Sequence, residues 1–214
     1  MSGLNETCSY FKDINCPAIQ NVSSYDYKRT ALYIQKYGIL LKEKKILVLG
    51  CGNASIENEL YNYYSFNDIT LVDFSPNLLH EASIKIPNAK IICCDLRTEI
   101  DKIKESFDVI YSVSVVQYFN KKEIKKINNY LMTILNKNGI IVHFNVPDKK
   151  RKSIYRVNNS IVFNDCKYLT PKFDFVDKYS RWCERKEFIT EKGKTTFITP
   201  SIDWERFDVI IKWI

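Results

Sequence analysis

The sequence lacks any long hydrophobic run. Its longest apolar stretches, such as Ile46–Leu49, are far shorter than the roughly 20 residues that a membrane-spanning helix needs. The N-terminal segment Met1–Tyr10 contains no basic stretch followed by an apolar one, so it predicts no signal peptide. We therefore expect a cytoplasmic protein with no membrane partner.

The sequence also lacks a C-x-x-C pair. Its seven cysteines are an odd number without an export signal, which favours reduced thiols over a disulfide framework or a zinc site. Cys93 and Cys94 are neighbours in a predicted strand and so point to opposite faces, which disfavours a shared metal ion. We expect the cysteines to act as small buried hydrophobic residues, and we expect no metal site. They occupy positions 8, 16, 51, 93, 94, 166 and 183.

Charge of one sign is only mildly in excess. The formal net charge is +7, and the lysines are spread along the chain. This balance is compatible with an anionic substrate and does not by itself predict a nucleic-acid partner. The length of 214 residues and the 45% hydrophobic content predict one globular domain, 1–214.

Short apolar strands alternate with helical segments along most of the chain. This order predicts an α/β fold with a doubly wound, mostly parallel sheet, because parallel strands covered on both faces are continuously apolar. The expected strands are 45–49, 69–73, 89–94, 107–113 and 139–145. The expected helices are 23–41, 53–64, 76–85 and 121–136, with Ser75 as N-cap and Pro76 at the first turn of the third.

The C-terminal third follows a different pattern. An irregular basic and aromatic stretch at 146–180 is expected to form a substrate-loop insertion, and 1–40 an N-terminal helical or lid segment. A helix is expected near 181–192, ending at Gly193. Two β-patterned runs follow at 194–199 and 205–213, and their short link requires an antiparallel pair. The sheet should therefore end in a reversed strand.

The strongest local motif is Gly50-Cys51-Gly52, at the end of the first strand. Glycine suits a sharp turn that a ligand must approach closely. Asp73 ends the second strand 23 residues after Gly50, where a carboxylate can accept both hydroxyls of a ribose, or can cap the next helix. Asp95 ends the third strand and can accept from an adenine amino group or cap a helix.

These elements resemble the class I S-adenosylmethionine-dependent methyltransferases. The resemblance rests on the segments 46–54, 72–74, 94–96, 107–119 and 135–140, and it resumes in the last helix and final strand pair. It implies a Rossmann-like seven-stranded sheet with a reversed final strand and S-adenosyl-L-methionine as cofactor. It also implies cofactor contacts: the methionine part at Gly50, Cys51 and Gly52, the ribose at Asp73, the adenine at Phe74, Asp95 and Leu96, and the far side at Ser112.

Two positions depart from the pattern of that family. Val48 stands where an acidic residue is usual, and Ala54 stands where a third glycine is frequent. The rival reading, a nicotinamide-dependent dehydrogenase, needs a glycine where this chain has Ser55.

Candidate residues for the methyl acceptor follow the fourth and fifth strands. Gln117 and Tyr118 lie where the family carries acceptor-facing residues, and His143 is either a base or a core histidine. Beyond the fifth strand, Asn145 and Asp148 are substrate contacts or turn residues. Lys149 and Arg151 recognise an anion, or belong to a solvated basic run.

The function we expect is O-methylation of a small anionic or sugar-type acceptor, such as a capsule or surface-polysaccharide precursor or a phosphoramidate group. The partner would be a small molecule, phosphorylated or nucleotide-linked. The alternatives are a protein or small-molecule N-methyltransferase and a non-catalytic cofactor-binding partner protein.

Overall fold

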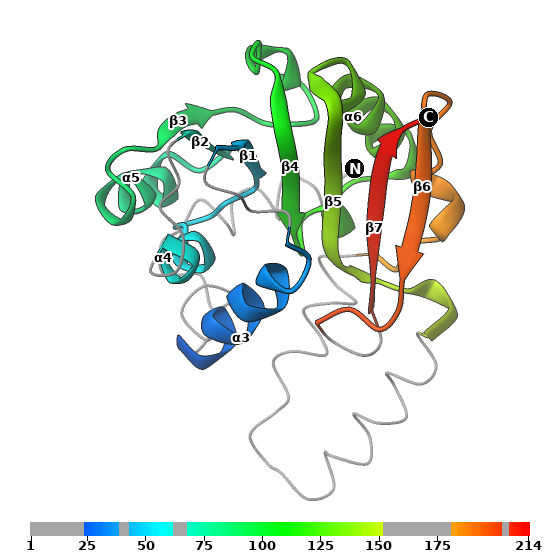
Figure 1. The fold of residues 1–214 in the computed structure, drawn as a ribbon, viewed down its shortest axis with the longest axis horizontal. Helices are drawn as coiled ribbons and strands as arrows, with labels where there is room; N and C mark the ends of the chain where they lie inside the picture. The colour runs from blue at the N-terminus through cyan, green and yellow to red at the C-terminus, as the bar shows by residue number, and fades with distance from the viewer. Residues whose placement is uncertain (1–23, 39–42, 62–67, 152–180, 203–205) are drawn as a thin grey trace, which may run out of the picture.

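The computed structural model describes residues 24–38, 43–61, 68–151, 181–202 and 206–214. Its centre is a seven-stranded sheet in the order β3-β2-β1-β4-β5-β7-β6 (Figure 1). The first five strands pair in parallel, whereas β7 is antiparallel to both of its neighbours. The predicted fold class, including the reversed final strand, is therefore confirmed. The strands are β1 Lys45–Leu49, β2 Asp68–Asp73, β3 Lys90–Cys93, β4 Phe107–Val113, β5 Leu135–Pro147, β6 Gly193–Ile198 and β7 Arg206–Trp213.

Helices cover both faces of the sheet (Figure 1). Alternate residues of β1 show this division, because Ile46 and Val48 join one buried cluster while Leu47 and Leu49 join the other. The first cluster includes residues of α3, α4 and α5, and the second includes residues of α6. These helices are α3 Ser24–Gln35, α4 Ser55–Tyr61, α5 Pro76–Lys85 and α6 Lys121–Thr133.

Local capping explains where two of these helices begin. The Ser75 hydroxyl accepts from the backbone N–H of Leu78, and Pro76 occupies the first turn of α5, as predicted. At α6, Asn120 accepts from the N–H of Glu123, whose carboxylate accepts in return from the N–H of Asn120. This reciprocal capping box satisfies N–H groups that have no partner within the helix.

The end of α6 differs from its prediction. The helix stops at Thr133, and Leu135 and Asn136 already belong to β5. Asn138 carries the left-handed φ of +69° in this segment, whereas Gly139 does not. A Cβ on Gly139 would lie 2.7 Å from Leu135 Cδ1, so close packing accounts for this glycine.

The prediction of a helix at 181–192 is wrong. This segment contains only a 3₁₀ turn at Arg185–Phe188, and Gly193 begins β6 instead of ending a helix. Cys183 is held extended, because its N–H donates to Pro147 O at 2.9 Å and its C=O accepts from Lys149 N at 3.0 Å. A Cβ on Gly193 would lie 2.8 Å from Ile211 Cγ2, so the glycine permits close packing on β7.

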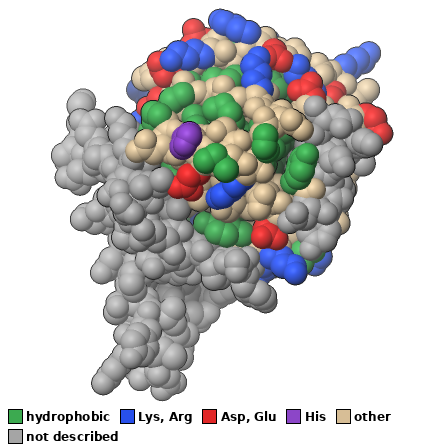
Figure 2. Space-filling view, turned by 90° about the vertical axis from the view of Figure 1, so that its left-hand side faces the viewer, with side chains coloured by type: hydrophobic (Ala, Val, Ile, Leu, Met, Phe, Trp, Pro, Cys, Tyr) green, Lys and Arg blue, Asp and Glu red, His purple; other side chains and the backbone are tan. Residues whose placement is uncertain are grey.

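Parts of the predicted N-terminal segment and substrate loop, 1–23 and 152–180, lie outside the described residues. Within the described ranges, no helix is both long and apolar enough to cross a membrane. On the face that carries α5 and β3, acidic and basic side chains are interspersed around hydrophobic ones (Figure 2). That face therefore shows no continuous basic patch among its described residues.

Candidate functional site

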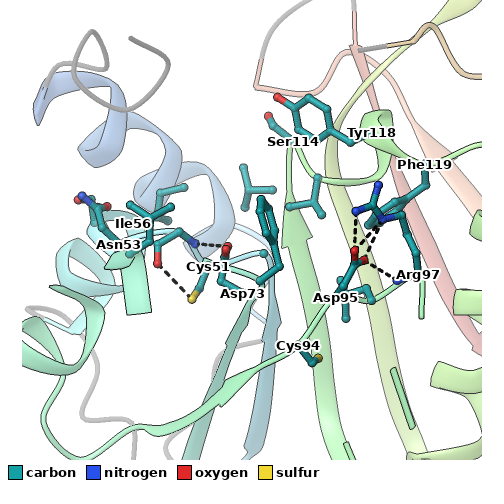
Figure 3. A pocket seen from close by; sticks show the side chains of 18 of the residues that line it. Cys51, Asn53, Ile56, Asp73, Cys94, Asp95, Arg97, Ser114, Tyr118 and Phe119 are labelled. Atoms are coloured by element: carbon teal, nitrogen blue, oxygen red, sulfur yellow. Dashed lines mark hydrogen bonds and ion pairs between the residues drawn. The ribbon is translucent and has the colours of Figure 1, made fainter. Parts of the chain in front are cut away.

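A cavity of about 280 Å³ opens at the carboxyl ends of β1, β2, β3 and β4 (Figure 3). The sheet order places β1 beside β4, so the direction of chain progression reverses at this point. Ligands of open α/β sheets bind at such reversals. The described lining residues are Tyr27, Gly50, Cys51, Gly52, Asn53, Ser55, Ile56, Asp73, Phe74, Leu78, Cys94, Asp95, Leu96, Arg97, Val113, Ser114, Val115, Tyr118 and Phe119.

The turn after β1 needs both of its glycines, for different reasons. Gly50 and Gly52 adopt φ values of +64° and +56°, which favour glycine. A Cβ on Gly50 would lie 2.6 Å from Val115 Cγ2, so this glycine lets the β4 loop approach the turn. A Cβ on Gly52 would meet no atom within 4 Å, so the backbone there faces open cavity.

Asp73 connects the ends of β1 and β2. One carboxylate oxygen accepts from Gly52 N and the other from Ser75 N, both at 2.9 Å. Burial raises the pKa of Asp73, and these N–H donors oppose that rise. The N–H of Phe74 contributes as well, and since a carboxylate has about four lone-pair sites, acceptor capacity remains beside these donors. Asp73 thus shapes the loop before α5 and also offers acceptors suited to a vicinal diol.

Asp95 forms a tight pair with Arg97. The guanidinium donates from Nε to both carboxylate oxygens, at 2.8 and 3.0 Å, and Arg97 N donates at 3.0 Å. Burial alone would raise the pKa of Asp95, but the hydrogen bonds and charge of Arg97 lower it overall. The positive charge of Arg97 is therefore neutralised inside the cavity.

The end of the cavity beside the glycine turn is braced from α5. Lys85 Nζ donates to Asn53 O and Ser55 Oγ, both at 2.9 Å, and Ser55 Oγ donates to Asn53 Oδ1 at 2.8 Å. The Cys51 thiol lines the same end. Burial, with the nearby carboxylates of Asp73 and Glu57, raises its pKa well above the ordinary value, so the thiol is neutral and a poor nucleophile.

The loop after β4 supplies the other end of the cavity. Ser114, Val115, Tyr118 and Phe119 line it, the last three in and beside a 3₁₀ turn at 116–118. α3 adds Tyr27 to the lining. This end is therefore mostly aromatic and apolar, with hydroxyl groups as its polar contribution.

The structure places Ser112 and His143 in the core and not along the cavity. Both are buried, and Ser112 Oγ lies 2.9 Å from His143 Nδ1. His143 Nε2 lies 2.8 Å from Asn128 Oδ1, an acceptor, so Nε2 carries the proton and Nδ1 accepts from Ser112. Burial lowers the pKa of His143 to about 4. The geometry assigns this neutral histidine to structure, without access to an acceptor.

Gln117 and Asp148 are also turned away from the described lining. Gln117 is buried, and its Oε1 accepts from Arg206 Nη1 at 2.7 Å. Asp148 is buried in an ion pair with Arg185 at 2.9 Å. Of the candidates around the 3₁₀ turn, only Tyr118 lines the cavity among the described residues.

The basic run after β5 lies in a 3₁₀ turn at Lys149–Arg151, outside the described lining. The Lys149 side chain is 59% exposed and pairs with Glu184. The structure thus does not bring Lys149 or Arg151 together with Tyr118 or the glycine turn.

The lining also includes residues that the sequence analysis did not propose individually, among them Tyr27, Arg97 and Ser114. Ser114 is the first residue after β4 and stands in the same relation to its strand as Gly50 does to β1. The rule that strand ends face the site would have found it. Tyr27 and Arg97 reach the cavity through tertiary packing and a loop, for which the sequence gives no periodic signal.

The cavity and sheet define a Rossmann-like α/β domain with a ligand site at its topological switch point. Residues 46–139 match the family model described as "Methyltransferase domain". Over 100 residues the chain is 29% identical to malonyl-[acyl-carrier protein] O-methyltransferase of Bacillus anthracis, covering 46% of this chain and 36% of that protein. Over 74 residues it is 35% identical to EEF1A lysine methyltransferase 4 of Mus musculus, covering 33% and 28%. The chain thus spans about a third of the length of these curated relatives.

Solved structures share the fold at low identity. Streptomyces venezuelae DesVI superposes with a TM-score of 0.63 at 12% identity, over 88% of this chain and 92% of that one. A TehB-like SAM-dependent methyltransferase from Corynebacterium glutamicum gives 0.55 at 18%, over 87% and 88%. Residues 46–139 are therefore similar to a methyltransferase domain, and the chain shares its fold with a solved SAM-dependent methyltransferase.

Proposed function

We propose that this protein transfers the methyl group of S-adenosyl-L-methionine to an oxygen atom of a small-molecule acceptor. The observation that carries the proposal is the cradle formed by Gly52 and Asp73. The glycine presents backbone to open cavity, and the aspartate keeps acceptor sites beside it. A nucleoside with a vicinal diol and an adjoining amino-acid chain suits this arrangement.

Apart from Ser112, which lies in the core, the residues assigned to the cofactor by resemblance line the cavity around this cradle. Gly50, Cys51 and Gly52 would hold its methionine part, Phe74 would pack on the adenine, and Leu96 with Asp95 would lie at the adenine edge; all line the cavity. When bound, the cofactor supplies a methyl group activated by its sulfonium charge. The protein contributes orientation and exclusion of water, which suit a displacement of this kind.

The acceptor is the finer part of the proposal. The sequence favours an anionic or sugar-type molecule, such as a surface-polysaccharide precursor or a phosphoramidate group. The described lining supports the hydroxyl-bearing, sugar-type alternative better, because Arg97 is already neutralised by Asp95 and the Lys149 side chain pairs with Glu184. The O-methyltransferase relative is consistent with an oxygen acceptor.

Calorimetric titration with S-adenosylmethionine and S-adenosylhomocysteine tests the cofactor part. We expect saturable binding that weakens at least tenfold in Asp73→Ala, because a buried carboxylate that binds two hydroxyls contributes more than 1.4 kcal/mol. The exposed Asp101→Ala serves as the matched control. An Asp73→Ala affinity equal to that of the wild type would refute the ribose assignment, and no binding at millimolar ligand would refute the enzyme proposal.

A further inference from the structure

Two non-glycine residues adopt left-handed backbone conformations at the carboxyl ends of adjacent central strands. Ser114 follows β4 with φ +56°, and Asn145 lies near the end of β5 with φ +61°. Asn145 occupies a register shift between β5 and β7, spanning His143 to Val146. Such conformations cost about 1–3 kcal/mol each and cluster at functional sites, where bulges re-aim side chains.

Asn145 is held in this conformation on three sides. Its N–H donates to Asp208 Oδ1 at 2.9 Å and to Ser201 Oγ at 3.0 Å, and its C=O accepts from Arg206 Nη1 at 2.9 Å. Its side-chain Nδ2 donates to Ser114 Oγ at 2.9 Å. The β7 residues and Ser201 therefore fix the backbone of Asn145, and Asn145 in turn fixes the hydroxyl of Ser114.

The direction of this last hydrogen bond decides what Ser114 offers to a ligand. Because the Asn145 amide donates, the serine oxygen is the acceptor, and its own proton is directed elsewhere. Ser114 lines the cavity, and Figure 3 shows its hydroxyl near Tyr118 at one end of it. Ser114 can therefore donate a hydrogen bond to a ligand that lies beside Tyr118.

The charges at this end argue for an uncharged partner. Among the described lining residues the charged side chains are Asp73, Asp95 and Arg97. Asp73 binds backbone N–H groups of the glycine turn and the α5 start, and Arg97 is paired with Asp95. Ser114 instead lies near Tyr118 (Figure 3), and Tyr27 is a further aromatic residue of the lining. An aromatic face beside a hydroxyl donor suits a ring that packs on that face and carries a hydroxyl group.

We propose that Ser114, oriented by Asn145, binds a hydroxyl of an uncharged ring that packs on Tyr118, and so determines the acceptor of the proposed methyltransferase. Asn145 is then a positioning residue that acts through Ser114. This inference rests on the proposed function, since it concerns the acceptor side of the same cavity. The ring has two chemical sources, a phenol or a sugar.

Saturation-transfer NMR on the complex with S-adenosylhomocysteine tests the proposal, with phenol and methyl β-D-glucopyranoside as probes. We expect one of the two probes to bind, which identifies the source of the ring. Ser114→Ala should lower the affinity for that probe at least fivefold. Calorimetry should show S-adenosylhomocysteine affinity unchanged within twofold. Ser83→Ala removes an exposed hydroxyl that donates to His80 O and should change neither measurement.

Asn145→Asp provides the sharper test of orientation. The new carboxylate accepts from Ser114 and turns the serine proton away from the cavity. The affinity for the probe should therefore fall as much as in Ser114→Ala. Asn145→Gly tolerates the positive φ while removing the side-chain donor. It should lower the affinity for the probe less than Asn145→Asp does. If neither Asn145 variant changes probe affinity while both remain folded by circular dichroism, the positioning role is wrong.

The remaining outcomes separate this inference from the proposed function. Absence of S-adenosylhomocysteine binding to the wild type overturns both. Cofactor binding without either ring probe overturns this inference alone, as does α-D-glucose 1-phosphate binding in place of the neutral probes. Loss of S-adenosylhomocysteine affinity in Ser114→Ala, with the probe unaffected, would assign Ser114 to the cofactor and also overturn it.

Discussion

Glu57 is a buried acid whose titration should be visible in the stability of the whole protein. It lies on α4, is 2% exposed, and accepts a hydrogen bond from the Tyr111 hydroxyl at 3.0 Å. Burial raises its pKa to about 7, although a backbone hydrogen bond, the Tyr111 hydroxyl and the charge of Lys85 each lower it. The folded protein therefore holds a proton on Glu57 at pH values where the unfolded chain has released it.

The sign and size of the effect follow from this difference. Between pH 4.5 and 7 the folded state binds more protons than the unfolded state, so the free energy of unfolding falls as the pH rises. The pKa difference is 7 − 4.5 = 2.5, which corresponds to about 3 kcal/mol at 1.36 kcal/mol per pKa unit. That is a large fraction of the 5–15 kcal/mol typical of a whole domain.

Glu57→Gln isolates this contribution. The amide keeps an oxygen that accepts from Tyr111, and it cannot ionise. We expect the variant to gain about 3 kcal/mol over the wild type as the pH rises from 4.5 to 8, measured as free energies of unfolding in urea. Glu59→Gln, on the same helix but only half-buried, is the matched control and should change little. Parallel pH dependence in Glu57→Gln and wild type would refute the reasoning.

Three further outcomes are expected. In the wild type, the free energy of unfolding should fall by about 3 kcal/mol as the pH falls from 6.5 to 4, because the pKa of His143 is about 4 in the folded protein and 6.5 in the unfolded chain. His143→Gln should remove this pH dependence, which is opposite in sign to that of Glu57. Urea unfolding again measures it, and an unchanged pH dependence would contradict the assignment. Gly50→Ala should lower the thermal midpoint through its contact with Val115, whereas Gly52→Ala should mainly weaken S-adenosylmethionine in calorimetry; the reverse pattern would contradict the cavity geometry. A double Ala variant of Lys149 and Arg151 should keep the Michaelis constant of the true acceptor within twofold of the wild-type value. A tenfold rise would instead support anion recognition by this basic run.

The centre of the sheet was predictable because β1 and β4 are mostly apolar. The bounds of β1 and β4 agree with their predictions, since burial on both faces leaves no ambiguity of period. The segment 181–192 failed because its structure depends on a distant partner. Cys183 pairs with the end of β5, and this contact outweighs the helical propensity of the local sequence.

Several lining residues of the cavity were equally accessible to sequence reasoning. Gly50 follows β1, Asp73 ends β2 and Asp95 lies just beyond β3, and parallel strands bring their carboxyl ends to one edge. The positions of His143 and Gln117 were not predictable, because both occupy suitable places in the sequence but point into the protein. Which side of a loop faces the cavity depends on partners such as Arg206, whose position no local pattern encodes.

The structure gives a physical reason for valine at position 48, where the methyltransferase pattern usually has an acidic residue. Val48 is buried in the cluster that contains Tyr111, its register partner on β4, and Tyr111 already hydrogen-bonds the buried Glu57. A carboxylate at position 48 would place a second desolvated acid in this cluster, where burial and like charge both oppose ionisation. Because Glu57 already occupies that environment, valine preserves the packing behind the glycine turn. The polar contacts to a cofactor must then come from residues beyond the strand, as Asp73 and the backbone of Gly52 are placed to provide.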